Sequence, residues 1–123
     1  VRNQLTSPTK QDFINAITYH YNSIREHALV TDTSLYSCGW LLDIARCLYT
    51  LKYNSVISKT DAGKWALKNN LCPEPDQMKK ALKVRKNPLK YKNNEKTKHW
   101  LSTLGPSVQL FANVLEQELN KVL

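Results

Sequence analysis

Apolar residues recur every three or four positions along most of this chain, which is the period of an α-helix and differs from the alternation of a β-strand. The strongest case is residues 35–51, where apolar side chains leave little polar surface. A helix that is apolar nearly all round belongs in the middle of a bundle. Residues 9–28 carry a single stripe, formed by Phe13, Ile17, Tyr21, Ile24 and Ala28. The pattern therefore predicts an all-α fold.

Local signals delimit two shorter helices. Ser58 precedes Asp61 by three residues, as in a capping box, so we expect a helix that begins there and continues to about residue 69. Another helix is expected over residues 75–86. It should end ahead of Pro88, because the residue before a proline avoids the α region.

The last helical segment contains a proline in its interior. Apolar residues keep their spacing from Leu101 to Val122 straight through Gly105 and Pro106, although a proline inside a helix costs about 3 kcal/mol. We expect one long element that is kinked or restarted near Pro106, with the proline in the first turn of the new helix. The predicted fold is an all-α bundle of about five helices, forming one domain over residues 1–123.

Composition limits the class of protein. With 123 residues, 41% of them apolar, and only three Gly and five Pro, the chain can build one core and is neither collagen-like nor disordered. No apolar run is long enough to cross a membrane, and residues 1–10 lack a signal peptide's apolar core. Cys38, Cys47 and Cys72 form no CxxC pair, so we expect free thiols and a cytoplasmic location. Val1 is compatible with a fragment or a processed chain.

Residue types that carry catalysis are sparse. The sequence has no P-loop, GxGxxG, GxSxG or HExxH motif, and no Asp-x-Asp pair that could hold a divalent metal. Asp43 and Arg46 lie three residues apart on a buried helix, which indicates either an internal ion pair or a ligand role for Arg46. His20 and His27 are expected on a core or boundary face, and His99 on the surface.

Positive charge is concentrated in residues 79–98. The chain carries 18 Lys plus Arg against 10 Asp plus Glu, a net charge of +8. Half of the basic residues lie in this region, together with Glu95: Lys79, Lys80, Lys83, Arg85, Lys86, Lys90, Lys92, Lys96 and Lys98. The region is either a solvated surface or a site for phosphates, in which Tyr91 and Trp100 could stack on bases.

Two segments carry a more specific pattern. Residues 41–51 read LLDIARCLYTL and residues 56–67 read VISKTDAGKWAL, with thirteen residues from Arg46 to Lys59. This combination resembles the C-terminal helical domain of the aminoglycoside adenylyltransferases, a family of nucleotidyltransferases. Residues 9–17 are similar to the segment that opens that domain, and the similarity is weak after Pro73.

The resemblance implies a role in transferring AMP from Mg-ATP to an acceptor hydroxyl. In that family an N-terminal nucleotidyltransferase domain holds magnesium and the catalytic base, and the helical domain closes the cleft, so this domain alone should be inert. By residue-wise correspondence, Arg46 and Lys59 would contact the ATP phosphates and Asp32 the acceptor. A second acidic position is Tyr36 here, and a tyrosine near the nucleotide falls at Arg85. Because aminoglycosides are polycations, the net charge of +8 favours another alcohol as acceptor.

Two other functions remain open from the sequence. A stand-alone basic helical module could bind nucleic acid or another polyanion through residues 79–98, although no RNA-binding or helix-turn-helix signature accompanies the charge. A helical RNase of toxin–antitoxin type would carry an Arg and a His about five or six residues apart on one helix. No His follows Arg46 at that distance, so the RNase motif is absent. Because the sequence carries neither signature, nucleic acid is not the partner we expect.

Overall fold

A computed structural model describes residues 7–123, and every regular element in that part of the chain is a helix. The elements are α1 (Lys10–His27), α2 (Tyr36–Tyr53), α3 (Lys59–Lys68), α4 (Pro75–Lys86), α5 (Pro88–Tyr91), α6 (Glu95–Ser102) and α7 (Gly105–Asn120). The predicted all-α fold is confirmed. The two elements beyond the expected five come from the charged region, which forms the short helices α5 and α6.

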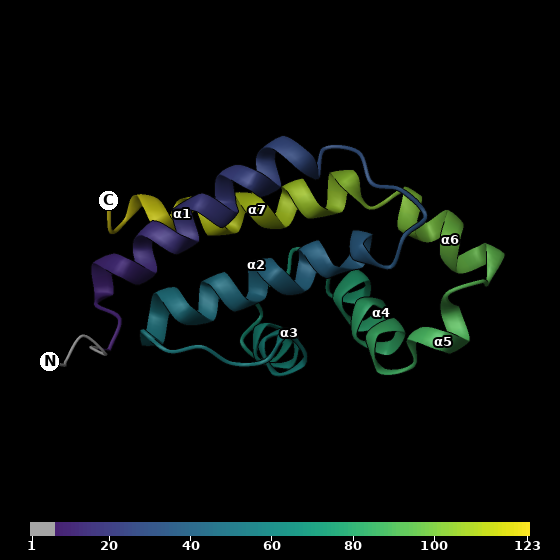
Figure 1. Cartoon of the computed structure of the whole chain (residues 1–123), viewed down its shortest axis with the longest axis horizontal. Coiled ribbons are helices and arrows are strands. Elements are labelled where there is room, and N and C mark those ends of the chain that lie inside the picture. The colour runs from purple at the N-terminus through teal and green to yellow at the C-terminus, as the bar shows by residue number, and fades with distance from the viewer. Residues whose placement is uncertain (1–6) are drawn as a thin grey trace, which may run out of the picture.

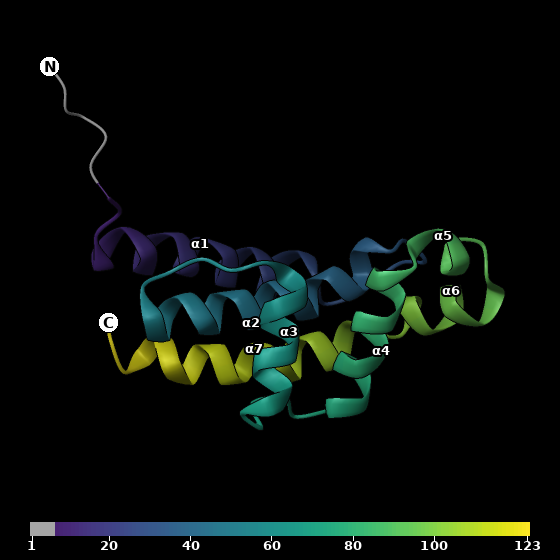
Figure 2. The ribbon, with the colours of Figure 1, turned by 90° about the horizontal axis from the view of Figure 1, so that it is seen from below.

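Three long helices lie side by side, α3, α4 and α6 pack against α2, and α5 packs against α4. Figure 1 shows α1, α2 and α7 along the length of the molecule, with α2 and α7 running opposite to α1. The view in Figure 2 shows α3 and α4 crossing the long helices, and α5 and α6 together at one end. Helix α2 contacts α1, α3, α4, α6 and α7, so it is the central helix that its apolar sequence predicts.

The hydrophobic core is continuous across the bundle. Leu42 and Ile44 of α2 are among its most deeply buried side chains, and they are joined by Met78 of α4 and Phe111 of α7. None of the helices in the described residues is long and apolar enough to span a membrane.

The predicted start of α3 at Ser58 is confirmed, although only one of the two hydrogen bonds of a capping box forms there. Ser58 caps α3 by accepting a hydrogen bond from the backbone N–H of Asp61 at 3.1 Å. A capping box with both reciprocal bonds is found instead at α1. There the Thr9 hydroxyl accepts from the Asp12 N–H at 3.1 Å, and the Asp12 carboxylate accepts from the Thr9 N–H at 2.9 Å.

The apolar stripe that passes through Pro106 belongs to two helices, so the chain restarts there. Helix α6 ends at Ser102, and α7 begins at Gly105 with the proline in its first turn. The break is stabilised from outside, because the buried Thr31 hydroxyl donates to the Leu101 carbonyl at 2.6 Å and accepts from the Leu104 N–H at 3.1 Å.

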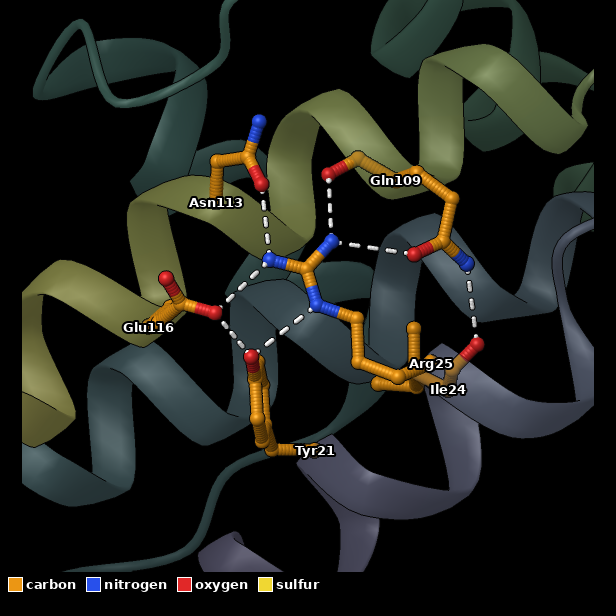
Figure 3. Close-up of polar contacts among 6 residues, drawn as sticks. All are labelled: Tyr21, Ile24, Arg25, Gln109, Asn113 and Glu116. Carbon is orange, nitrogen blue, oxygen red and sulfur yellow. Dashed lines mark hydrogen bonds and ion pairs between the residues drawn. The ribbon is translucent and has the colours of Figure 1, made fainter.

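A polar clamp joins α1 to α7 (Figure 3). The Arg25 guanidinium donates to the Gln109 side chain at 3.0 Å, to Asn113 at 2.7 Å and to Glu116 at 3.2 Å. Tyr21 donates to the same Glu116 carboxylate and accepts from Arg25 Nε at 3.0 Å. The two hydrogen bonds that Glu116 accepts hold its pKa below the usual value, the one from Tyr21 most strongly and the one from Arg25 next.

Candidate functional site

Arg46 and Lys59 are both placed by the connection from α2 to α3. The Arg46 guanidinium donates through Nε to the Ile57 carbonyl at 3.1 Å, which ties this connection to the side of α2. Lys59 is the first residue of α3, and its ammonium pairs with the Asp43 carboxylate at 3.1 Å. The Asp43–Arg46 ion pair, one of the two alternatives the sequence left open, is therefore not formed, because the chain reversal brings Lys59 to Asp43 instead.

Two depressions flank this junction. The first, a small cleft of about 230 Å³, lies between α1 and α2 and is lined by Arg46, Asp43 and His20 among apolar residues. The second is larger, about 920 Å³, and we call it the α2–α4 groove. Its lining residues are Thr33, Ser34, Leu35, Tyr36, Cys38, Gly39, Leu42, Lys59, Thr60, Val84, Arg85, Pro88, Lys92 and Asn93. Lys59 and Arg85 thus share one groove, and Arg46 opens on the neighbouring cleft.

The α2–α4 groove is positively charged. Lys59, Arg85 and Lys92 line it, and no Asp or Glu is among its lining residues. Burial raises the pKa of the Cys38 thiol to about 11, while the positive charges of Arg85 and Lys59 act in the opposite direction. Both cations therefore lie near the same side chain at the start of α2. Cationic side chains with neighbouring hydroxyls are the groups that bind phosphate oxygens.

Asp32 lies beside the groove and outside its lining. One oxygen of its carboxylate accepts hydrogen bonds from the Ser34 N–H at 2.8 Å and the Ser37 hydroxyl at 3.1 Å. Asp32 therefore shapes the turn that leads into α2. Tyr36 lines the groove, with 86% of its surface exposed.

Some expectations for the polar residues are wrong. Trp100 is buried, and its indole N–H donates to the Gln77 side chain at 2.6 Å, so it offers no free face for a base. The Lys80 ammonium lies 4.8 Å from the centre of the Trp100 ring. His20 and His27, expected on a core or boundary face, are both exposed, because the buried stripe of α1 is formed by its isoleucines at positions 14, 17 and 24.

The three cysteines are free, as expected. Cys38 and Cys47 are buried, and burial raises the pKa of the Cys47 thiol to about 12 and that of Cys72 to about 11. They behave as small apolar side chains. Among the residues that the structure describes, no group of three or more His, Cys, Asp or Glu could hold a metal ion.

The sequence reasoning missed Lys92 and Gly39 as groove residues. Lys92 belongs to the charged run, in which nothing local separates it from eight other cations. Gly39 lies inside α2, and a Cβ built on it would meet no atom within 4 Å. A glycine inside a helix is the one signal that could have singled it out, because glycine weakens a helix interior.

Comparison with known proteins gives one family. Residues 5–117 match the family described as aminoglycoside adenylyltransferase, C-terminal domain. No significant match was found among curated proteins or among solved structures. The family match covers the central helix, the groove and most of α7, and it agrees with the resemblance carried by residues 41–67. The chain belongs to the family of aminoglycoside adenylyltransferase C-terminal domains.

Proposed function

We propose that this chain binds the phosphates of ATP and part of an acceptor for an adenylyltransferase reaction. The observation that supports it best is the pairing of family membership with a basic groove. The family match covers residues 5–117, and Lys59 and Arg85 line one groove of about 920 Å³ beside Arg46. A triphosphate needs several cations close together, and this junction supplies them on three elements.

The residues at the junction fit a nucleotide phosphate chain. Lys59 is part-exposed and stands at the capped start of α3, where backbone N–H groups also favour anions. Arg46 uses Nε to hold the Ile57 carbonyl and lines the cleft, so its two terminal nitrogens would be free to bind a phosphate there. Asp43 holds Lys59 in place until a phosphate competes for it. The chain's own role is thus to bind and orient the phosphates.

The reaction would need a second domain. The acceptor oxygen would attack the α-phosphate, the bond from that phosphorus to the β-phosphate would break, and pyrophosphate would leave. The hydroxyl proton would pass to a base of an N-terminal nucleotidyltransferase domain, which would also supply the carboxylates for magnesium. Magnesium lowers the negative charge of the phosphates, and this chain supplies cations that act from the other side.

The test is ATP binding after the chain is joined to an N-terminal nucleotidyltransferase domain. Each of Arg46→Ala and Lys59→Ala should weaken ATP binding by about tenfold to a hundredfold, since a hydrogen bond to a charged group is worth about 1.5–3 kcal/mol. Lys64→Ala is the matched control, because Lys64 is exposed on the same helix as Lys59 and lies outside the groove. Unchanged affinity in both site variants would refute the proposed roles.

The alternative function, a nucleic-acid-binding module, is distinguished from the proposed one by measuring the binding of the isolated chain. This alternative predicts tight binding to DNA or RNA that weakens steeply as the salt concentration rises. The burial of Trp100 removes one of the two aromatic side chains that this alternative would use for stacking. Failure to retain the chain on heparin at low salt would exclude it, and RNA cleavage by the isolated chain would instead indicate the RNase function.

A further inference from the structure

The small cleft between α1 and α2 holds an imidazole beside the Arg46 guanidinium. Helix α1 contributes His20 to the lining of this cleft, and α2 contributes Asp43 and Arg46. The other lining residues are Phe13, Ala16, Ile17, Cys47, Thr50 and Val56. His20 is therefore the side chain through which α1 can bring a charge to the cleft.

The His20 imidazole is available to a ligand. His20 is exposed on α1, and it forms no hydrogen bond or ion pair with another residue in the described part of the chain. The centre of the Tyr19 ring lies 6.0 Å from the centre of the imidazole, with the two rings at 71° to each other. Such an edge contact leaves the ring nitrogens of His20 open to an oxygen atom.

The net charge of the cleft depends on whether His20 is protonated. Arg46 contributes one positive charge and Asp43 one negative charge, so these two balance. The Cys47 thiol adds no charge, because burial raises its pKa to about 12. Lys59 lies beyond Asp43, which it meets at 3.1 Å. Histidine gains its positive charge between about pH 8 and pH 5, so the cleft lining changes from neutral to positive in that range.

We propose that His20 is a further phosphate-binding side chain of this junction and that its protonated form pairs with a phosphate oxygen of ATP. The imidazolium donates a hydrogen bond to the phosphate that Arg46 binds in the cleft. It also offsets the negative charge of Asp43 when Lys59 turns from that carboxylate to the phosphates. This assignment rests on the proposed function, because it takes the junction as the place of the ATP phosphates.

The test is an NMR titration of the 123-residue chain with ATP at pH 6 and at pH 8. At pH 6, His20→Gln should bind ATP about fivefold to tenfold more weakly than the parent chain, a range set by an exposed ion pair and a charge-assisted hydrogen bond. At pH 8 the two should differ by less than about twofold, because the parent imidazole is then largely uncharged. Comparing variants at the same pH cancels the titration of ATP itself.

His27→Gln is the matched control, because His27 is exposed on the same helix and lies outside the cleft. It should bind ATP like the parent chain at both pH values. His20→Lys keeps a positive charge at both, so it should bind ATP more tightly than the parent chain at pH 8.

Parent affinity of His20→Gln at pH 6, an equal loss at both pH values, or the same loss in His27→Gln would each overturn the proposal. Arg46→Ala separates its failure from that of the proposed function. If Arg46→Ala weakens ATP binding and His20→Gln does not, the role of His20 alone is refuted. If neither variant changes the affinity, the phosphate-binding role of the junction is refuted as well.

Discussion

The packing of α7 against the loop after α1 makes a specific prediction at Gly105. A Cβ built on this residue would lie 2.2 Å from the Leu29 carbonyl oxygen, 3.0 Å from the Leu29 carbonyl carbon and 3.3 Å from Val30 Cα. All three atoms belong to the backbone, so no side-chain rotation relieves the contact. The substitution Gly105→Ala must therefore push the start of α7 away from this loop.

The size of the effect follows from two opposing terms. Forcing an extra methyl group into a packed contact costs about 1–3 kcal/mol, occasionally more. Replacing glycine by alanine in a helix interior returns about 0.5–1 kcal/mol, and in the first turn about 0.5 kcal/mol or less. The free energy of unfolding of Gly105→Ala should therefore fall by about 0.5–2.5 kcal/mol, which corresponds to a melting temperature lower by roughly 4 °C per kcal/mol for a domain of this size.

Gly39→Ala is the matched control, because it makes the same chemical change at a helical glycine with open space around it. This variant should be more stable than the parent chain by about 0.5–1 kcal/mol. Urea unfolding followed by circular dichroism measures the free energy of unfolding of both variants. Equal slopes of this free energy against urea concentration would show that both variants unfold between the same folded and unfolded states as the parent chain. The reasoning is refuted if Gly105→Ala is as stable as the parent chain, or if both alanines destabilise it equally.

Three further predictions concern charge. The pKa of Glu116 is lowered in the folded chain from 4.5, so its contribution to the free energy of unfolding should be present above pH 4.5 and should be lost as the pH falls through the folded pKa. In an acid titration, the free energy of unfolding of Glu116→Gln should therefore fall less steeply than that of the parent chain. An identical profile would contradict the role of the clamp. Asp43→Asn should free Lys59 and raise ATP affinity up to about fivefold, measured by calorimetry, since a part-exposed ion pair is worth about 0.2–1 kcal/mol; weaker binding would contradict it. Burial raises the pKa of Cys38 to about 11, so at pH 8 its thiolate fraction is roughly 0.1%, against about a quarter for a free thiol. Cys38 should therefore react with iodoacetamide far more slowly in the folded chain than in urea. Mass spectrometry of the labelled peptides measures the two rates, and equal rates would contradict the prediction.

The helix boundaries could be predicted from the sequence because their signals are local. Ser58 caps the helix it precedes, and the stretch between α4 and α5 turns at Asn87 and Pro88. The short helices α5 and α6 were not predicted, since they are largely polar and charged. What holds α6 is burial of Trp100 and Leu101 against the rest of the core, which only the folded chain provides.

The site was predicted less completely, and the reason is again the range of the interactions. The spacing of Asp43 and Arg46, three residues apart, left open either an ion pair between them or a ligand role for Arg46. In the folded chain Asp43 meets Lys59 at 3.1 Å and Arg46 meets the Ile57 carbonyl at 3.1 Å. Both partners come from the connection to α3, whose path over α2 is not encoded in any short window. The family pattern did mark Arg46 and Lys59, and both lie at the junction of the cleft and the groove.

The concentration of basic residues at 79–98 is better explained by their individual positions than by their number. Arg85 and Lys92 line the α2–α4 groove, and Lys80 lies over the Trp100 ring. Lys98 pairs with Glu95 at 3.7 Å, and Lys90 lies 5.4 Å from the centre of the Tyr91 ring. These side chains have different neighbours, and Lys79, Lys80 and Lys83 line a further depression together with Asp76. Arg85 and Lys92 are exposed although they share the groove, so their effect on the binding of an anion should fall as the salt concentration rises.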